Sequence, residues 1–381
     1  MTAPARQRLC VVVSSAGTIR SSQLNHLAAL GRRFDVTVVA NATDFRLLEP
    51  LGPSVTGLAV GIERSVSPRR DLAALWGLYA HFRAGNYAAV YSVTPKAGLL
   101  AMLAARLAGI PVRLHIFTGQ VWVTARGPMR TILRAADRLI AALATHVLAD
   151  SRSQVEFLVA EGILKPGKAL VLAAGSISGV DTRRFVPNPA ARAAIRAQFG
   201  IGGSEVLFLY IGRLKRDKGL FDLARAFAGL ARVRANVRLA IVGPDEEGLS
   251  GPLLELCRDC RDRVVIPGRT DRPEDFMAAA DVLCLPSYRE GFGSVVIEAA
   301  AAGIPSIGSR IYGVTDSIEE GVTGLLHDAA DSASLLGRML ELVDAPERRL
   351  ALGAKARERA IREFSAERVT AAFVDYLTGL L

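Results

Sequence analysis

The stretch from residue 281 to residue 302 reads Asp281-Val-Leu-Cys-Leu-Pro-Ser-Tyr-Arg-Glu-Gly-Phe-Gly-Ser-Val-Val-Ile-Glu-Ala-Ala-Ala-Ala302. The run 281–287, a short apolar segment closed by Pro and Ser, predicts a buried strand and its exit. The Ala-rich run 295–302 predicts a buried helix, and Ser294 before it is a residue type favoured at helix N-caps. Backbone N–H groups at such a strand–loop–helix junction point outward and attract phosphate.

Glu298 is the one charged residue in this predicted helix. It lies about one turn from the helix start among Val, Ile and Ala side chains. An unpaired carboxylate buried there would cost several kcal/mol, so it must accept hydrogen bonds. The donor is either another part of the protein or a polar ligand lying across the helix start, and spacing alone leaves both open.

Short apolar runs alternate with helical segments on both sides of this stretch. Such alternation predicts doubly wound parallel sheets that bind ligands at the carboxyl ends of their strands. The Gly- and Pro-rich segment 175–189 interrupts the pattern and predicts a linker. We therefore expect an α/β fold of two Rossmann-like domains facing each other across a cleft, residues 1–184 and 185–361, with a helix at about 362–381 packing back on the first. The expected strands are 9–13, 35–40, 89–92, 112–116, 146–150, 206–211, 238–242, 264–266 and 305–307, with another in the run 281–287.

Composition narrows the class of protein. The chain has 381 residues, 50% of them hydrophobic and 22% charged, which suits two soluble globular domains. It has no run of about 18 uncharged apolar residues, so no transmembrane helix is expected, and the run 9–13 is too short for a signal peptide. Cys257 and Cys260 form a lone Cys-x-x-Cys without a second pair or a nearby His, so we expect neither zinc nor a disulfide framework. These features fit a reducing cytoplasm.

The net charge of +10 is concentrated in the first half of the chain. Residues 1–184 hold 22 Lys and Arg against 10 Asp and Glu, and residues 185–381 hold 25 against 27. A basic half suggests an anionic partner, such as anionic lipid or a phosphorylated substrate. Nucleic acid is not expected, because aromatic residues are few and no nucleic-acid motif is present. A basic surface kept for solubility explains the excess as well.

A predicted helix from Pro128 carries part of this charge. Arg130, Arg134 and Arg138 are spaced four apart beside Ile132, Leu133, Leu139 and Ile140. This stripe suits a helix lying on an anionic membrane surface, and an ordinary solvated helix face is the alternative.

A second basic cluster follows the strand predicted at 206–211, and it reads Gly212-Arg-Leu-Lys-Arg-Asp-Lys-Gly219. The carboxyl end of a strand before a helix is where an open α/β sheet binds anions. Two of the six lysines of the chain fall here. Arg supplies a planar fork for phosphate oxygens and Lys supplies a compact charge.

Three motifs occur in a familiar order: Gly212-Arg213 with Lys218-Gly219, then Pro267-Gly268-Arg269, then the Glu-x7-Glu of Glu290 and Glu298. Together they resemble the retaining nucleotide-sugar glycosyltransferases of family 4, which have the GT-B fold. The segment 175–185 resembles the interdomain segment of that family. The resemblance covers nearly the whole chain.

The resemblance implies a set of donor-site residues. Arg213 and Lys218 would hold the donor diphosphate, Glu290 the donor sugar and Glu298 the ribose hydroxyls. No Asp-x-Asp occurs in the chain, so no metal and no cofactor are expected, and the donor is expected to be a UDP-sugar. The other residues implied in donor binding are Gly17, Gly212, Arg269, Gly291, Phe292, Gly293, Ser294 and Val295.

The first domain would bind the acceptor. Lys96 opens a helix after a strand, which is a place for an anion, and Thr118-Gly119 stands where many relatives have His-Gly, with His115 nearby. In local sequence these segments resemble family members that extend polyprenyl-diphosphate-linked saccharides for surface polysaccharides or glycans. We therefore expect a lipid-linked acceptor and a peripheral position on the cytoplasmic face of the plasma membrane. A soluble acceptor, a related epimerase and a nonenzymatic nucleotide- or glycan-binding scaffold are the alternatives.

Overall fold

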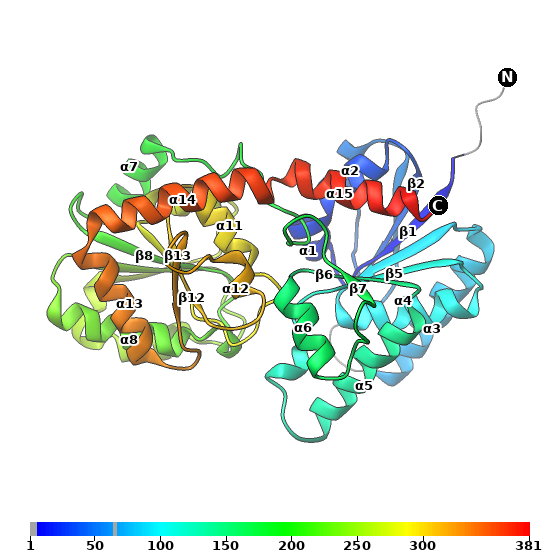
Figure 1. Cartoon of the computed structure of the whole chain (residues 1–381), viewed down its shortest axis with the longest axis horizontal. Helices are drawn as coiled ribbons and strands as arrows, with labels where there is room; N and C mark the ends of the chain where they lie inside the picture. Colours follow the sequence, from blue (N-terminus) through cyan, green and yellow to red (C-terminus); the bar gives the residue numbers. More distant parts are fainter. Residues whose placement is uncertain (1–5, 64–66) are drawn as a thin grey trace. The chain divides into compact units, whose positions relative to one another are not determined.

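A computed structural model describes residues 6–63 and 67–381 of the chain (Figure 1). By its internal contacts the chain divides into two compact units. The first comprises the residues up to Ser178 together with Ala366–Leu381, and the second comprises Gly179–Ser365. The sequence places the first boundary after residue 184 and the start of the returning helix at about 362.

The first unit is built on a seven-stranded parallel sheet in the order β3-β2-β1-β4-β5-β6-β7. The register is continuous, as in β1 and β4, where Cys10 lies opposite Val90. The edge strands β3 and β7 are absent from the expected set. The strands are β1 (Arg8–Val12), β2 (Asp35–Ala40), β3 (Val55–Ala59), β4 (Ala89–Val93), β5 (Val112–Phe117), β6 (His146–Ala149) and β7 (Ala169–Leu170).

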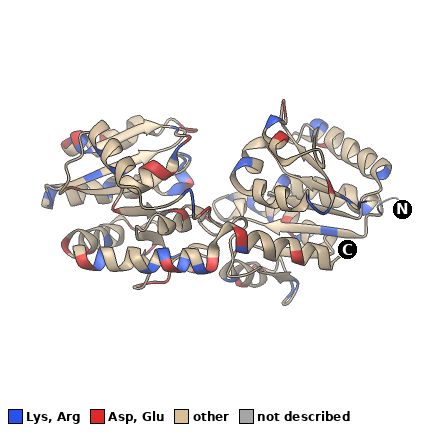
Figure 2. Cartoon of the chain, turned by 90° about the horizontal axis from the view of Figure 1, so that it is seen from above, with Lys and Arg blue, Asp and Glu red and all other residues tan. Residues whose placement is uncertain are grey.

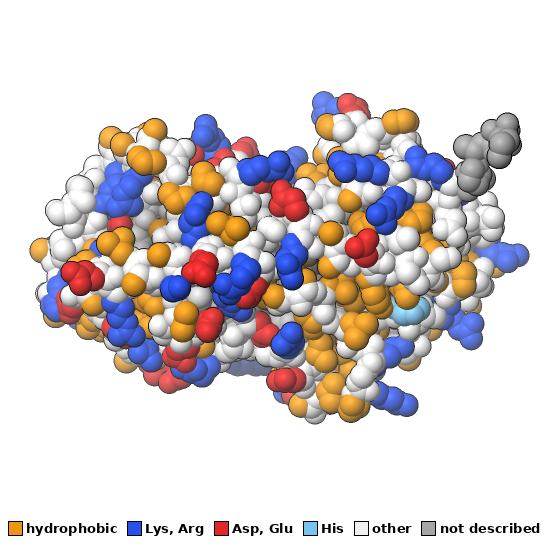
Figure 3. All heavy atoms as spheres, turned by 45° about the horizontal axis from the view of Figure 1, so that its top comes forward, with side chains coloured by type: hydrophobic (Ala, Val, Ile, Leu, Met, Phe, Trp, Pro, Cys, Tyr) orange, Lys and Arg blue, Asp and Glu red, His pale blue; other side chains and the backbone are white. Residues whose placement is uncertain are grey.

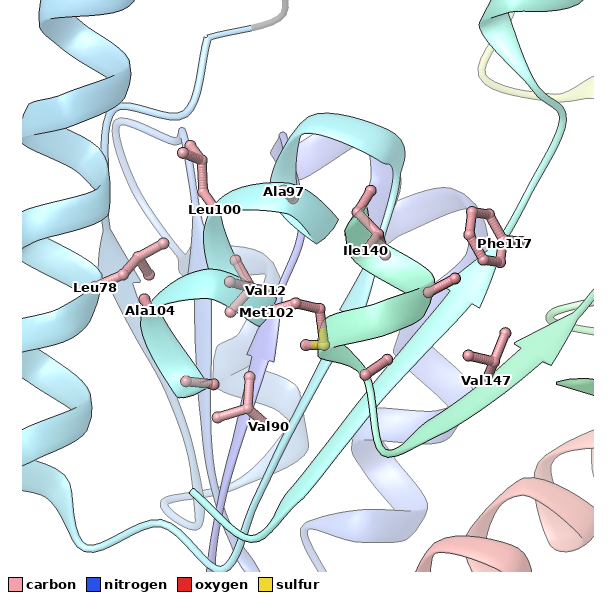
Figure 4. Packing of buried hydrophobic residues seen from close by; sticks show 14 of the residues in the cluster. Val12, Leu78, Val90, Ala97, Leu100, Met102, Ala104, Phe117, Ile140 and Val147 are labelled. Carbon is pink, nitrogen blue, oxygen red and sulfur yellow. The ribbon is translucent and has the colours of Figure 1, made fainter. Parts of the chain in front are cut away.

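Helices cover both faces of this sheet, so its central strands β1, β4 and β5 are almost wholly buried. Side chains alternate along β1, so Cys10 and Val12 point into the core under α3 (Pro68–Gly85), α4 (Pro95–Leu107) and α5 (Gly127–Leu143), as Figure 4 shows for Val12. The next residues along, Leu9 and Val11, point to the other face, where α2 (Leu24–Leu30) and α15 (Ala366–Gly379) pack. The remaining helical segments are α1 (Ala16–Thr18), η1 (Ile19–Gln23), η2 (Arg46–Leu51), η3 (Val121–Val123) and α6 (Arg152–Ala160).

The second unit repeats the plan with six parallel strands in the order β10-β9-β8-β11-β12-β13. One face is covered by α8, α9 and α13, which pack on Phe208 and Tyr210 of β8. The strands are β8 (Val206–Ile211), β9 (Val237–Val242), β10 (Val264–Gly268), β11 (Val282–Leu285), β12 (Ser306–Ser309) and β13 (Gly324–His327). The helices are α7 (Pro189–Gln198), η4 (Arg216–Lys218), α8 (Leu220–Val233), α9 (Ser250–Leu256), η5 (Arg258–Arg263), α10 (Pro273–Ala279), α11 (Ser294–Ala301), α12 (Val314–Ser317), α13 (Ser332–Asp344) and α14 (Pro346–Phe364).

Two parallel, helix-covered sheets confirm the predicted pair of Rossmann-like domains. The four cysteines are buried free thiols. In residues 6–63 and 67–381, no helix has both the length and the apolar composition needed to cross a bilayer.

Candidate functional site

The basic loop 212–219 and the loop 286–293 leave neighbouring strands of the second sheet. β8 and β11 pair in parallel, with Leu209 opposite Leu283, so both loops start at the same edge. Gly219 brings them into contact: its φ is +66°, and a Cβ built there would lie 1.9 Å from the carbonyl oxygen of Pro286. Only glycine combines that left-handed backbone with so close an approach.

Two adjacent ion pairs join the loops. Lys218 Nζ lies 2.6 Å from Glu290 Oε1, and Arg289 Nη2 lies 2.6 Å from Asp217 Oδ2. The order of charge is reversed between the loops, with acid then base at 217–218 and base then acid at 289–290. All four side chains are less than one fifth exposed, so the pairs are shielded from salt and water.

The pKa of Asp217 reflects this setting. Burial alone would raise it, but the positive charges of Arg289, Lys218 and Lys215 outweigh burial and hold the pKa below its ordinary value. The backbone adds a further link, because the N–H of Tyr288 donates to the Asp217 carbonyl at 2.9 Å. The Asp217–Arg289 pair was not among the residues expected from the sequence.

Arg213 lies beside an acidic loop that follows β9. Its guanidinium is 3.4 Å from Glu246 Oε2, and Lys215 Nζ is also 3.4 Å from that oxygen. The Tyr210 hydroxyl donates to the Arg213 carbonyl at 2.8 Å, which fixes the backbone directly after Gly212. Arg213 stays 43% exposed. The sequence signal for its acidic partner was the run Asp245-Glu246-Glu247 after the neighbouring strand.

The start of α11 differs from the expected cap. Gly293, with φ +77°, is the N-cap, and Ser294 is the first helical residue. The N-cap therefore has no side chain to accept from the amides of the first turn, and these amides belong to the segment 293–295 assigned to donor binding. Behind them, Gly313 packs so closely that a Cβ would lie 2.4 Å from the Gly291 carbonyl oxygen, and Phe292 is buried.

Glu298 lies on the fifth position of α11 and is half-buried. Its carboxylate receives no hydrogen bond from any residue that the structure describes. Burial raises its pKa to about 7, while the charge of Arg184 lowers it and that of Glu274 raises it further. Arg184 is occupied by Glu274, at 2.7 Å. Of the two alternatives left open by spacing, a polar ligand fits this unpartnered carboxylate better than a protein donor.

Two other donor-site candidates belong to neither of these loops. Arg269, directly after β10, is 64% exposed and 3.0 Å from Asp271. Gly17 belongs to the first unit, where it lines an open cavity of about 690 Å³ with Arg20 and Asn41 at the carboxyl ends of β1 and β2.

The three acceptor candidates of the first unit have different surroundings. Lys96 Nζ lies 2.5 Å from Asp71 Oδ1 on α3. The carbonyl of Thr118, a partly exposed residue, accepts from the side-chain amides of Gln120 and Gln154, each at 2.6 Å.

His115 does not face an acceptor. Its ring is 1% exposed, Nδ1 lies 2.9 Å from Ser92 Oγ, and Gly98 packs against the ring. Burial lowers its pKa to about 3, so the ring is neutral at ordinary pH. We therefore correct the expectation of a binding role: its position on a central strand places the ring in the core.

The predicted basic stripe on α5 is also corrected in part. Arg134 lies 2.9 Å from the Glu161 carboxylate and donates to the Glu161 carbonyl, and Arg138 donates to the Gly162 carbonyl at 2.9 Å. Both therefore satisfy carbonyls at the C-terminal end of α6. Ile140, expected beside the stripe, is fully buried.

Two family models match the chain. The family model "Glycosyl transferases group 1" matches residues 191–359, and the model "Glycosyl transferase 4-like domain" matches residues 16–175. The capsular polysaccharide biosynthesis glycosyltransferase CapM of Staphylococcus aureus is 26% identical over 94% of this chain and 92% of its own length. A D-inositol 3-phosphate glycosyltransferase of Streptomyces scabiei is 32% identical over 74% of this chain and 66% of its own length.

Solved structures share the fold. The sucrose-phosphate synthase of Thermosynechococcus elongatus has a TM-score of 0.83 at 21% identity, covering 98% of this chain and 99% of its own. Anabaena HepE in complex with UDP and glucose has a TM-score of 0.80 at 20% identity, covering 98% and 100%. The two family models together span most of the chain, one on each sheet, and the chain therefore belongs to the group 1 glycosyltransferases, with a GT-B fold and a glycosyl transferase 4-like first domain.

Proposed function

We propose that this glycosyltransferase moves a hexose or N-acetylhexosamine from a UDP-sugar to a saccharide carried on polyprenyl diphosphate, with retention of anomeric configuration. One observation carries the donor half of this proposal. Lys218 and Glu290 meet at 2.6 Å on two loops of one sheet edge, and the unpartnered Glu298 lies on the helix that follows one of them. Cations for a diphosphate and carboxylates for sugar hydroxyls are thus supplied by a single unit.

The chemistry follows from where charge develops. When the bond from the anomeric carbon to the diphosphate oxygen breaks, the electron pair leaves with the diphosphate. Arg213 and Lys218, held by Tyr210 and Glu290 respectively, would stabilise that charge in place of a metal ion. Preorganised donors of this kind lower the barrier because they need no reorganisation during the reaction.

Retention of the anomeric configuration implies that the leaving diphosphate receives the proton of the acceptor hydroxyl. The acceptor hydroxyl attacks the face that the diphosphate is leaving, and its proton passes to the departing diphosphate oxygen. Glu290 then positions the sugar and balances its developing positive charge, without forming a covalent bond. The short pair with Lys218 suits this role, because a carboxylate already held by an ammonium group is a poor nucleophile.

The relatives support a UDP-sugar without fixing it. HepE is described with UDP and glucose, and a Mycobacterium tuberculosis relative, 32% identical over 53% of this chain, is described as GDP-mannose-dependent. Base recognition beside Gly268-Arg269 would use backbone groups. A panel of UDP-, GDP- and ADP-sugars, read by thermal shift and donor hydrolysis, separates these donors, since a bound donor raises the melting temperature by mass action.

The lipid-linked acceptor is supported by similarity to capsular polysaccharide and lipopolysaccharide glycosyltransferases such as CapM and WaaG, and by the basic first half. We place the enzyme peripherally on the cytoplasmic face of the plasma membrane. A soluble acceptor is the second candidate, favoured by the relatives named for inositol 3-phosphate and malate. Transfer to a polyprenyl-linked saccharide but not to a water-soluble one supports the first, and the reverse pattern overturns it.

The catalytic assignment is tested by Arg213→Ala and Lys218→Ala. Each is expected to lower turnover on the order of 10²–10³-fold while the far-UV circular dichroism stays unchanged. Arg261→Ala, an exposed arginine of the same unit, is the control and should turn over normally. Near-normal turnover in the first two variants defeats the assignment. A wild-type protein that binds UDP-sugars but neither hydrolyses nor transfers them would instead be a nonenzymatic scaffold.

A further inference from the structure

The outward faces of α3 and α5 carry large apolar side chains in solvent. On α3, Leu72 and Trp76 are 66% and 69% exposed, and their spacing of four places them on one face. On α5, Ile132 and Leu139 are 60% and 45% exposed, seven residues apart and again on one face. Six of the twelve exposed large apolar side chains in the described part of the chain lie between residues 68 and 143. Their concentration there distinguishes this surface from a scatter of single residues.

The same segment is strongly basic and has no free acid. Residues 68–143 contain ten Lys and Arg but only two acidic residues, Asp71 and Asp137. Asp71 pairs with Lys96 at 2.5 Å, and buried Asp137 accepts from the Trp122 indole at 2.7 Å. Both negative charges are thus engaged inside the layer of helices.

Four exposed arginines belong to α3, to the first turn of α5 or to the residue just before α5. They make no ion pair within the ranges that the structure describes, and they are Arg69, Arg83, Arg126 and Arg130. Other surfaces differ: α14 carries both signs of charge along its length (Figure 2), and the face drawn in Figure 3 has acidic side chains interspersed with basic ones. The α3–α5 surface is therefore unusual in combining apolar side chains with unpaired positive charge.

The placement of this surface matters for the acceptor. α3, α4 and α5 lie side by side on one face of the first sheet (Figure 1). Each helix that follows a strand of a parallel sheet begins at the carboxyl edge, where such sheets bind ligands. Trp76 and Ile132 lie within nine residues of the start of α3 and α5, which is about 14 Å along a helix. The apolar side chains are therefore close to the edge that carries Lys96.

We propose that the outward faces of α3 and α5, with Arg69, Arg83, Arg126 and Arg130, form the docking surface for an anionic lipid bilayer. This rests on the proposed lipid-linked acceptor, and it deepens that proposal by naming the face and the residues that meet the membrane. Trp76 lies at the interface, where the amphipathic indole is favoured. The arginines contact lipid phosphates, and Leu72 and Ile132 enter the boundary of the acyl chains.

The charges favour a bilayer over a second copy of the chain. In an isologous dimer the same patch meets itself, so arginines would face arginines, while the nearby carboxylates of Glu63 and Glu161 are already paired with Arg70 and Arg134. A bilayer with anionic headgroups supplies the missing negative charge and accepts the apolar side chains at the same time. Docking in this way presents the carboxyl edge of the first sheet to the headgroup layer, where the diphosphate of a polyprenyl-linked acceptor would lie.

Tryptophan fluorescence tests the docking face directly. The chain has two tryptophans, and Trp122 is fully buried, so a change in emission on membrane contact reports Trp76. The full chain is mixed with vesicles of phosphatidylcholine and phosphatidylglycerol, or of phosphatidylcholine alone, and both flotation and emission are measured. We expect flotation with a blue shift on the anionic vesicles only, weakened by added salt.

Variants assign the binding to this face. Trp76→Ala with Leu72→Ala is expected to weaken partitioning roughly ten-fold, and each of Arg69→Ala and Arg130→Ala about five-fold. Leu350→Ala, which removes a side chain 71% exposed on α14, and Arg261→Ala are the matched controls and should bind as wild type. UDP-sugar hydrolysis and the UDP-induced thermal shift should be unchanged in every one of these variants.

Three results overturn the proposal. Flotation without a Trp76 shift, unaffected by the α3 and α5 variants, would place the membrane contact elsewhere. Absence of flotation on any vesicle, in a protein that still hydrolyses donor, would remove the membrane and leave the transferase assignment standing. Concentration-dependent dimerisation lost in the Trp76 variant would make a second copy the occupant. Failure of donor hydrolysis in wild type, by contrast, counts against the proposed function and not against the docking face.

Discussion

Glu298 shows how a single carboxylate connects folding to binding. It lies half-buried in an Ala-rich helix, its pKa is raised to about 7 by burial, and no described residue donates to it. The folded state therefore favours the neutral acid, and ionisation is easier in the unfolded chain. The contribution of Glu298 to the free energy of unfolding is therefore fully present below its ordinary pKa of 4.5, and it is lost as the pH rises through about 7.

Replacing Glu298 with Gln should therefore stabilise the ligand-free protein in a pH-dependent way. The variant is expected to match wild type near pH 4.5, and to gain up to about 3 kcal/mol of unfolding free energy above pH 7, since one pKa unit corresponds to about 1.4 kcal/mol. The thermal shift induced by UDP should shrink, because an amide replaces the acceptor for ribose hydroxyls. Melting curves across this pH range check both effects, and a melting difference that stays constant with pH would contradict the raised pKa.

At this scale the sequence predicts some residues well and others poorly. A lone carboxylate among alanines stands out by pattern, and Lys218 stands out as a rare lysine at a strand end. His115 could not be separated from a binding histidine, because its burial depends on Gly98 of a different element closing over the ring. The Asp217–Arg289 pair was equally hidden, since its partners are 72 residues apart.

The contact between the loops 212–219 and 286–293 depends on the absence of a side chain at Gly219. Gly219 and Gly248 share almost the same left-handed backbone, with φ of +66° and +67°. A Cβ at Gly219 would meet the Pro286 carbonyl oxygen at 1.9 Å, whereas one at Gly248 would meet nothing within 4 Å. The two positions therefore separate backbone strain from loop contact.

Gly219→Ala should lose UDP-sugar binding and hydrolysis, because the loops must move apart and Lys218 must leave Glu290. Gly248→Ala should keep both, although each variant carries the cost of about 1–2 kcal/mol for a non-glycine residue in left-handed backbone. The measurements are calorimetric UDP titration and denaturant unfolding. Equal losses of UDP affinity in the two variants would show that strain alone, and not the loop contact, is responsible.

The charge-reversed ion pairs give a second prediction for these loops. Removing one member of a buried pair leaves an uncompensated charge, which costs about 3–5 kcal/mol. Asp217→Ala and Arg289→Ala should each destabilise the second unit by roughly that amount, and the double variant by clearly less than the sum. Both singles should also slow donor hydrolysis, because Lys218 and Glu290 follow directly in the chain. Additive losses in a double-mutant cycle would mean that the two side chains do not interact.

Elements with strong apolar runs were predictable, and those without them were not. β8 and β11 are continuous apolar segments, so their place beside each other and the convergence of their loops followed from the parallel α/β pattern. β3, β7 and β13 were absent from the expected set because they are short or lie at the sheet edge, where half the pairing partners are missing. The N-cap at Gly293 was missed because Ser294 has the more familiar capping chemistry, while the tight turn against Leu285 requires glycine.

On the scale of the whole chain, the last helix completes the first unit and not the second, to which the preceding helix α14 belongs. His26 of α2 joins this helix to the rest of the first unit: Nδ1 lies 3.0 Å from Thr370 Oγ1 of α15, and Nε2 lies 2.6 Å from the carbonyl of Ile177, which lies outside α15. The ring also stacks on Phe373 at 4.6 Å. Burial lowers the His26 pKa to about 4, so the neutral ring donates to the carbonyl through Nε2 and accepts from the threonine through Nδ1.

This arrangement predicts that damage to α15 is confined to one unit. Phe373 is buried against Tyr91 and His26 of the first unit, so Phe373→Ala should lower the unfolding free energy of that unit by about 3–5 kcal/mol. The second unit holds the donor residues and should keep its protection and its UDP affinity. Hydrogen exchange resolved by segment, with and without UDP, distinguishes the two units. Ile361→Ala on α14, where the side chain is 42% exposed, is the control and should change neither. Loss of protection across Gly179–Ser365 in the Phe373 variant would show that the two units unfold together, and that the stability of the donor site depends on a helix packed against the other sheet.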